Sequence, residues 1–198
     1  MSLDFFRKQL ADTIRIKEAL LEDQSAMEAI LAIAQGCTKA LQAGKKVLIA
    51  GNGGSAADAQ HFAGELVSKF YFDRPALGSI ALTTDTSIMT AIGNDYGYEK
   101  LFERQIQALG QPGDVFIGIS TSGTSKNIVA ALTEAKRMGL VCYGWAGAKE
   151  GPMDALCSVL LHVPSSSTPR IQECHGTAGH MICAYIEEQI FGHLAPAR

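Results

Sequence analysis

Carboxylate, imidazole and amide side chains stand at helical spacing in two distant parts of the sequence. His61 and Glu65 lie four residues apart, so a helix would present both on one face. Gln172 and His180 lie eight residues apart, which also places them roughly on one side of a helix. Together they could coordinate zinc, or a carboxylate and an imidazole could act as an acid and base pair on a sugar. An isolated His-x-x-x-Glu is more often a helix-surface pair, so either chemistry requires that the two helices meet.

A glycine-rich turn precedes the segment that carries His61. The apolar run 47–51 predicts a buried strand, and the turn after it opens an alanine-rich helix whose first N–H groups could bind an anion. The turn matches G-x-G-x-x-A, but no acidic residue ends the next strand about twenty residues on, as nicotinamide-dinucleotide binding requires. We therefore predict a phosphosugar or another small anion as its ligand, and no nucleotide cofactor. The residues of this turn are Asn52, Gly53, Gly54 and Ser55, with Ser55 expected as the helix N-cap.

A second loop, rich in hydroxyl groups, follows the apolar run 114–120 and opens another helix. Its hydroxyls and free N–H groups could surround a phosphate, and it lacks the Lys-Ser/Thr pair of a Walker A loop. The alternative is an ordinary serine-rich turn with an N-cap. Because both loops would open at one sheet edge, where doubly wound folds bind ligands, we favour the phosphate site. Its candidate residues are Ser120, Thr121, Ser122 and Ser125.

A third polar group lies between the two loops in the sequence. The run Gly93-Asn94-Asp95 predicts a break between a short helix that begins near Thr86 and a longer helix that begins near Glu99. Asp95 is either a helix cap or a carboxylate that binds a sugar hydroxyl, and the sequence pattern fits both.

The elements that must position these residues alternate between strands and helices. This alternation predicts one α/β domain, with a parallel sheet, right-handed crossovers and helices on both faces in a three-layer αβα arrangement. A short helix is expected at 152–156 and a long one at 169–191, whose apolar positions nearly encircle it, so that it is buried centrally or between subunits. The five expected strands are 47–51, 79–82, 114–120, 140–145 and 158–163.

Two helices are expected before the first strand. Residues 3–22 form an amphipathic pattern, and a second helical pattern runs to residue 44 with Ser25 as its expected N-cap. Their position ahead of an α/β core suggests packing between subunits. We therefore divide the chain into an N-terminal helical segment, 1–45, and a core domain, 46–198.

Composition excludes several classes of protein. With 198 residues and a formal net charge of −3, the chain fits one domain and has no basic cluster for nucleic acid. Its five cysteines show no paired metal spacing, which favours reduced, buried thiols and a cytoplasmic location. Charged residues interrupt the N-terminal apolar positions, so we expect neither a signal peptide nor a membrane span.

Five segments, together with His180, resemble the phosphoheptose isomerase family of SIS (sugar isomerase) domain proteins over nearly the whole chain. The resemblance implies conversion of sedoheptulose 7-phosphate to D-glycero-D-manno-heptose 7-phosphate, the first step toward activated heptose for lipopolysaccharide or capsule. It also implies a cytoplasmic homotetramer with active sites between subunits and one zinc ion per subunit. The segments are 52–66 (NGGSAADAQHFAGEL), 82–87 (LTTDTS), 91–97 (AIGNDYG), 119–125 (ISTSGTS) and 170–173 (RIQE).

The same resemblance assigns roles to individual residues. The catalytic pair would be Glu65 and His180, through an enediol that requires one carboxylate to reach both carbons. The zinc ligands would be His61, Glu65, Gln172 and His180. The substrate contacts would be Asn52, Gly53, Gly54, Ser55, Glu65, Asn94, Asp95, Ser120, Thr121, Ser122, Ser125 and Gln172.

A related protein without catalysis is the alternative. An SIS protein that binds a replication initiator, or one that senses a sugar phosphate, would not need the acid and base pair. Glu65 and His180 are both present here, and the residues before the first strand contain no basic recognition helix. The sequence therefore favours the enzyme.

Overall fold

The computed structural model describes residues 2–196, which contain a single parallel sheet of five strands in the order β2-β1-β3-β4-β5. The predicted α/β class and five-stranded parallel sheet are confirmed, and each strand lies within about two residues of its predicted position. The strands are β1 (Val47–Gly51), β2 (Ser79–Ala81), β3 (Val115–Ile119), β4 (Val141–Ala146) and β5 (Val159–His162).

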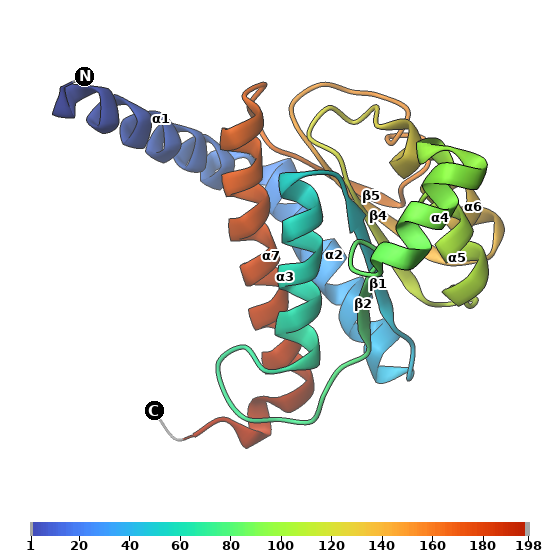
Figure 1. Ribbon diagram of the computed structural model, residues 1–198. Coiled ribbons are helices and arrows are strands. Elements are labelled where there is room, and N and C mark those ends of the chain that lie inside the picture. Colours follow the sequence, from blue (N-terminus) through green and yellow to red (C-terminus); the bar gives the residue numbers. More distant parts are fainter. Residues whose placement is uncertain (1, 197–198) are drawn as a thin grey trace.

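Helices cover both faces of the sheet because its central strands are apolar on both sides. In β1, Val47 and Ile49 belong to one hydrophobic core, while Leu48 and Ala50 belong to the other. Figure 1 shows the resulting three layers. One face carries α2 (Gln24–Gln42), α3 (Gly54–Val67) and α7 (Thr168–Phe191), and the other carries α4 (Thr86–Tyr96), α5 (Glu103–Leu109) and α6 (Lys126–Arg137).

The strand order creates a switch point between β1 and β3. From β1 the chain crosses through α3 to β2 on one side, and it then returns through α4 and α5 to β3 on the other side. Loops that leave the carboxyl ends of β1 and β3 therefore diverge and leave a crevice, which is where open α/β sheets bind ligands. Both loops expected to bind phosphate lie at this edge.

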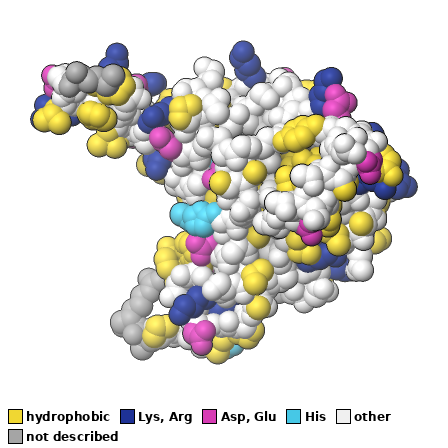
Figure 2. All heavy atoms as spheres, in the orientation of Figure 1, with side chains coloured by type: hydrophobic (Ala, Val, Ile, Leu, Met, Phe, Trp, Pro, Cys, Tyr) yellow, Lys and Arg dark blue, Asp and Glu magenta, His cyan; other side chains and the backbone are white. Residues whose placement is uncertain are grey.

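The N-terminal helix α1 (Leu3–Glu22) projects from the body of the molecule (Figure 1). Its buried residues, Ile16 and Leu20, lie in its C-terminal half. Large apolar side chains along its length are exposed, and Figure 2 shows hydrophobic groups on this projecting arm. They are Leu3, Phe5, Phe6, Leu10, Ile14 and Leu21. Within the described residues, no helix is both long and apolar enough to cross a membrane.

Two predicted helix caps are wrong. The N-cap of α2 is Asp23, whose carboxylate accepts from the backbone N–H of Ala26, while the hydroxyl of Ser25 donates to that same carboxylate. The N-cap of α3 is Gly53, with φ +56°, and Ser55 lies buried inside the first turn. The turn is too tight for a serine cap, because a glycine conformation is needed at the residue that redirects the chain.

The predicted helix break at Gly93-Asn94-Asp95 is also wrong. Helix α4 continues through these residues to Tyr96, and its C-cap is Gly97, where φ is +84° and an L side chain would be strained. The predicted longer helix is divided into the 3-10 turn η1 (Tyr98–Lys100) and α5, and residues 152–156 form a turn instead of a helix. A second 3-10 turn, η2 (Gly192–Leu194), follows α7.

Candidate active site

A close contact between α3 and α7 brings the predicted site residues together. The two helices run in the same direction, since Gly54 contacts Gln172 near their starts and His61 contacts His180 further along. At Gly179 an added Cβ would lie 2.1 Å from the ring of Phe62, so glycine is needed for this approach. The sequence thus places its smallest residue beside the histidine that must reach the neighbouring helix.

The histidine and glutamate side chains of these helices form one cluster. Nε2 of His61 lies 3.0 Å from Oε1 of Glu65 and 3.4 Å from Nε2 of His180. One ligand atom from each of the three residues lies within 4.8 Å of the others. Figure 2 shows histidine beside an acidic side chain in a hollow at the edge formed by α3 and α7. The meeting of the two helices, on which both the zinc and the acid–base interpretations depend, is present.

The cluster has the chemistry of a metal site. A ring nitrogen carries either a proton or a lone pair, so Nε2 of His61 cannot donate to Glu65 and also accept from His180. A tetrahedral ion with bonds of about 2.0–2.2 Å would hold its ligand atoms about 3.4 Å apart. Two of the three separations, 3.0 and 3.4 Å, are close to that value, and the third, between Glu65 and His180, is no more than 4.8 Å. Two imidazoles and a carboxylate are typical zinc ligands, and they fit such an ion here.

Aromatic rings lie on the buried side of the cluster. Phe62 stacks on His61 with ring centroids 5.4 Å apart, and Phe70 lies 5.6 Å from His180. Phe62 is itself buried against Trp145, with centroids 5.2 Å apart. These apolar neighbours reduce the local dielectric constant, which strengthens interactions between charges at the cluster.

Gln172 lies at the other end of the helix pair. Its amide packs so closely on Gly54 that a Cβ there would lie 2.5 Å from Nε2 of Gln172. At about 1.5 Å of rise per residue, Gln172 and His180 are about 12 Å apart along α7. Within this chain, Gln172 therefore adjoins the glycine turn and not the cluster. Its place among the substrate-binding residues fits these contacts, and its role as a metal ligand stays a prediction.

The glycine turn is held by an amide network that the sequence analysis missed. Asn52 and Asn127 exchange two side-chain hydrogen bonds, of 2.9 and 2.8 Å. The hydroxyl of Tyr98 donates to Oδ1 of Asn52 at 2.9 Å. Asn127, two residues after the hydroxyl loop, and Tyr98, directly after Gly97, could have been suspected from their place beside recognised motifs. The network joins the turn after β1 to the loop after β3.

Asn94 and Asp95 lie on the exposed part of α4. The amide of Asn94 donates to Oδ1 of Asp95 at 2.8 Å. Asp95 lies inside α4, and the N-cap of the 3-10 turn that follows is Gly97, so Asp95 is not a helix cap. The structure places neither residue in contact with the α3 and α7 cluster within the described chain, and their substrate role stays a prediction.

The hydroxyl loop is organised by its own side chains. The hydroxyls of Ser120 and Ser125 lie 2.8 Å apart, and Gly123 turns the chain with φ +68°. Ser125 occupies the N-cap position of α6 without a side-chain capping bond, which speaks against the simple serine-cap interpretation. Thr121 and Ser122 line a cavity of about 350 Å³ on one side of the loop. The loop therefore presents hydroxyls to a hollow at the carboxyl edge of the sheet, and α6 begins directly after it.

Comparisons with known proteins show what this chain is similar to. The SIS domain pattern matches residues 10–147. The chain is 55% identical over 190 residues to a phosphoheptose isomerase of Burkholderia pseudomallei, with 96% of each chain covered. It is 57% identical over 188 residues to phosphoheptose isomerase 2 of Campylobacter jejuni, covering 95% of this chain and 94% of the other. The solved phosphoheptose isomerase of Neisseria gonorrhoeae superposes with a TM-score of 0.88 at 39% identity, covering 94% of this chain and 98% of that one.

Proposed function

This chain belongs to the phosphoheptose isomerase family of SIS-domain proteins, and we propose that it converts sedoheptulose 7-phosphate to D-glycero-D-manno-heptose 7-phosphate through an enediol. It is an enzyme, an aldose–ketose isomerase. The observation that carries the mechanism is the meeting of Glu65 and His180, whose functional atoms lie within 4.8 Å of each other although the residues are 115 apart in sequence. The product would supply activated heptose for lipopolysaccharide or capsule.

Glu65 moves the carbon-bound proton in this mechanism. The carboxylate removes a proton from C1 of the open-chain ketose, and the electron pair forms the C1–C2 double bond of the enediol. The same group, now protonated, returns the proton to C2 and so generates the aldose. Glu65 suits this task because it lies at the edge of the hollow, with its side chain 24% exposed.

His180 exchanges protons with the two substrate oxygens. The C2 oxygen must gain a proton as the enediol forms, and the C1 hydroxyl must lose one as it collapses to the aldehyde. An imidazole can donate and accept near neutral pH, so one ring serves both steps. Phe70 and His61 flank this ring and limit its orientation.

A zinc ion is the metal that fits the cluster. His61, Glu65 and His180 would hold it. The family resemblance implies Gln172 as the fourth ligand, whereas within one chain its amide packs on Gly54. When bound, the ion would polarise the substrate carbonyl and stabilise negative charge on oxygen. Glu65 and His180 would then each have two roles, Glu65 as ligand and base and His180 as ligand and proton carrier.

The hydroxyl loop would bind the phosphate. Ser120, Thr121, Ser122 and Ser125 present hydroxyls and N–H groups at the start of α6, where an anion is stabilised. The turn at Asn52 to Ser55 and the amide of Gln172 lie between this loop and the cluster along α3, and would contact the sugar hydroxyls. Asn94 and Asp95 would contribute from α4. Binding energy at the phosphate would orient the distant reacting carbons.

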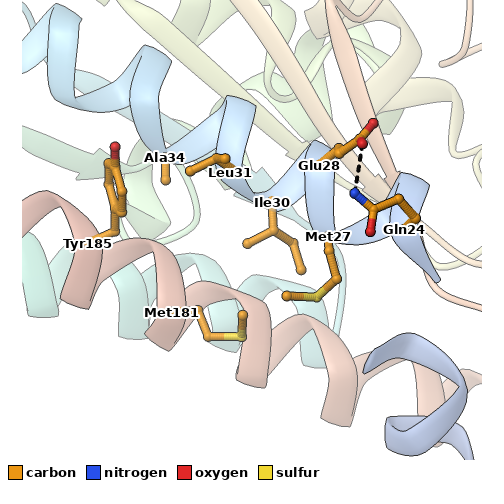
Figure 3. A pocket seen from close by; sticks show the side chains of 8 residues that line it. All are labelled: Gln24, Met27, Glu28, Ile30, Leu31, Ala34, Met181 and Tyr185. Carbon is orange, nitrogen blue, oxygen red and sulfur yellow. Dashed lines mark hydrogen bonds between the residues drawn. The ribbon is translucent and has the colours of Figure 1, made fainter. Parts of the chain in front are cut away.

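The active enzyme is proposed to be a cytoplasmic homotetramer. The exposed apolar groups of α1 need a partner, and an apolar groove of about 360 Å³ between α2 and α7 offers further contact surface (Figure 3). The five cysteines are all free thiols, as suits a reducing compartment. Light scattering should give the mass of a tetramer of 21.1 kDa chains, and a monomer mass would contradict the assembly.

The activity is tested directly with the purified protein. Incubation with sedoheptulose 7-phosphate should produce the aldose signals of D-glycero-D-manno-heptose 7-phosphate in the NMR spectrum, approaching the same equilibrium from either side. A chain that binds the sugar phosphate without interconverting the two would be the non-catalytic SIS protein instead. Addition of a chelator, followed by zinc, would show whether turnover depends on the metal.

A further inference from the structure

A buried ion pair joins the loop after α3 to α7, and neither of its two residues has yet been given a role. Nε of Arg74 donates to Oε1 of Glu187 at 3.0 Å, and each side chain is only 1% exposed. Glu187 lies on α7 seven residues, or two turns, after His180. Arg74 lies in the loop between α3 and β2. Burial of two charged side chains destabilises the folded state unless hydrogen bonds within the protein replace the hydration that the charges lose.

The remaining N–H groups of Arg74 cap the C-terminal end of α3. Nη2 donates to the carbonyl oxygen of Glu65 at 2.8 Å, and Nη1 donates to that of Leu66 at 2.7 Å. Both carbonyls belong to the last turn of α3, where helical partners are missing. The guanidinium therefore caps the helix and holds the backbone of the residue that carries the proposed catalytic carboxylate.

Glu187 uses its carboxylate to hold the loop that follows α3. It accepts from the backbone N–H groups of Phe70 at 2.8 Å and Tyr71 at 2.6 Å. The ring of Phe70 lies 5.6 Å from that of His180. Burial disfavours the ionised form of the Glu187 carboxyl group and acts to raise its pKa. The hydrogen bonds and the charge of Arg74 outweigh this effect, so the pKa of Glu187 lies below its ordinary value. Glu187 is therefore ionised at neutral pH.

We propose that Arg74 and Glu187 are positioning residues for the isomerase reaction, and that their ion pair sets the place of Glu65 on α3 relative to His180 on α7. The pair holds the backbone of Glu65 on one side and, on the other, the backbone N–H of Phe70, the residue whose ring lies beside His180. A shift of about 1 Å between reacting groups can cost a hundred-fold in rate. This inference rests on the proposed roles of Glu65 and His180.

Arg74→Lys and Glu187→Gln test the inference. Lysine keeps the charge but cannot reach Glu187 and both carbonyls together, since it lacks the planar fork of arginine. We expect each variant to lower kcat about ten- to hundred-fold, with KM within about twofold of the wild type, because the phosphate loop lies on other elements. Zn²⁺ affinity, measured by calorimetry on the protein without substrate, should fall by a similar factor.

Asp114→Asn provides a matched control. Asp114 is also 1% exposed, accepts from two backbone N–H groups and pairs with Lys46, but it directly precedes β3 and its partners, Lys46 and Gln111, lie on neither α3 nor α7. This variant should lose comparable thermal stability and keep the kcat and Zn²⁺ affinity of the wild type.

The outcomes separate positioning from stability. If Arg74→Lys and Glu187→Gln melt at lower temperature but retain wild-type kcat and Zn²⁺ affinity per folded chain, the pair only stabilises the fold and the inference is overturned. If Glu187→Gln does not fold, the kcat and the Zn²⁺ affinity of Arg74→Lys decide whether the pair positions Glu65 or only stabilises the fold. A wild-type protein without isomerase activity would remove the proposed function, while the comparison of Zn²⁺ affinities would still decide the role of the pair.

Discussion

Glu65→Gln is expected to lower kcat by about a thousand-fold or more, because general bases contribute rate factors of about 10² to 10⁴ and this one serves two proton transfers. Glutamine has nearly the same shape as glutamate, but its neutral amide cannot take a proton from carbon. The side chain lies at the rim of the hollow, where it forms a hydrogen bond with His61. The variant should therefore fold and assemble like the wild type.

The measurement for Glu65→Gln is turnover at saturating sedoheptulose 7-phosphate, with thermal melting to verify the fold. Ser125→Ala is the control at the other end of the substrate. It removes a hydroxyl that lies 2.8 Å from that of Ser120, so it should weaken phosphate binding and raise KM about ten-fold, with a much smaller effect on kcat. Near-normal turnover by Glu65→Gln would exclude Glu65 as the base.

The sheet could be predicted from sequence because local pattern and burial agree there. Val47 and Leu48 face opposite cores, so a strand that reads as an unbroken apolar run must be covered on both sides. Helix ends were predicted less well. The N-cap of α2 is Asp23 and not Ser25, and α4 runs to Tyr96 instead of breaking at Gly93-Asn94-Asp95. Several residues there could form a cap or turn, and tertiary packing selects among them.

The candidate site could be predicted in part. Spacing identified His61 with Glu65, but His180 reaches His61 across 119 residues, and this approach depends on the packing of Phe62 into the space at Gly179. Similarly, Asn127 meets Asn52 across 75 residues, and Glu187 meets Arg74 across 113. No local pattern signals such pairs, because the energy that forms them comes from three-dimensional packing and from the need to satisfy buried polar groups.

His180→Gln is the second large effect expected. Glutamine can form hydrogen bonds, but it cannot exchange protons near neutral pH, so kcat should fall by about 10² to 10⁴. The variant also removes one of three convergent ligand atoms, so Zn²⁺ affinity should fall in the same protein. His193→Gln is the control, since His193 is an exposed histidine in η2 and should give wild-type kcat and affinity when replaced.

Comparing the two variants separates the roles within the cluster. If Glu65 and His180 act as one unit on the same carbons, the double variant should be hardly slower than the slower single variant, because effects within a unit are not additive. If kcat of His180→Gln recovers at high Zn²⁺ concentration, the histidine acts as a ligand and another group moves the oxygen-bound protons. If kcat stays low with the metal bound, the imidazole is the proton carrier. In that case the remaining ligands still hold the metal ion, but no group exchanges protons with the substrate oxygens in place of the imidazole.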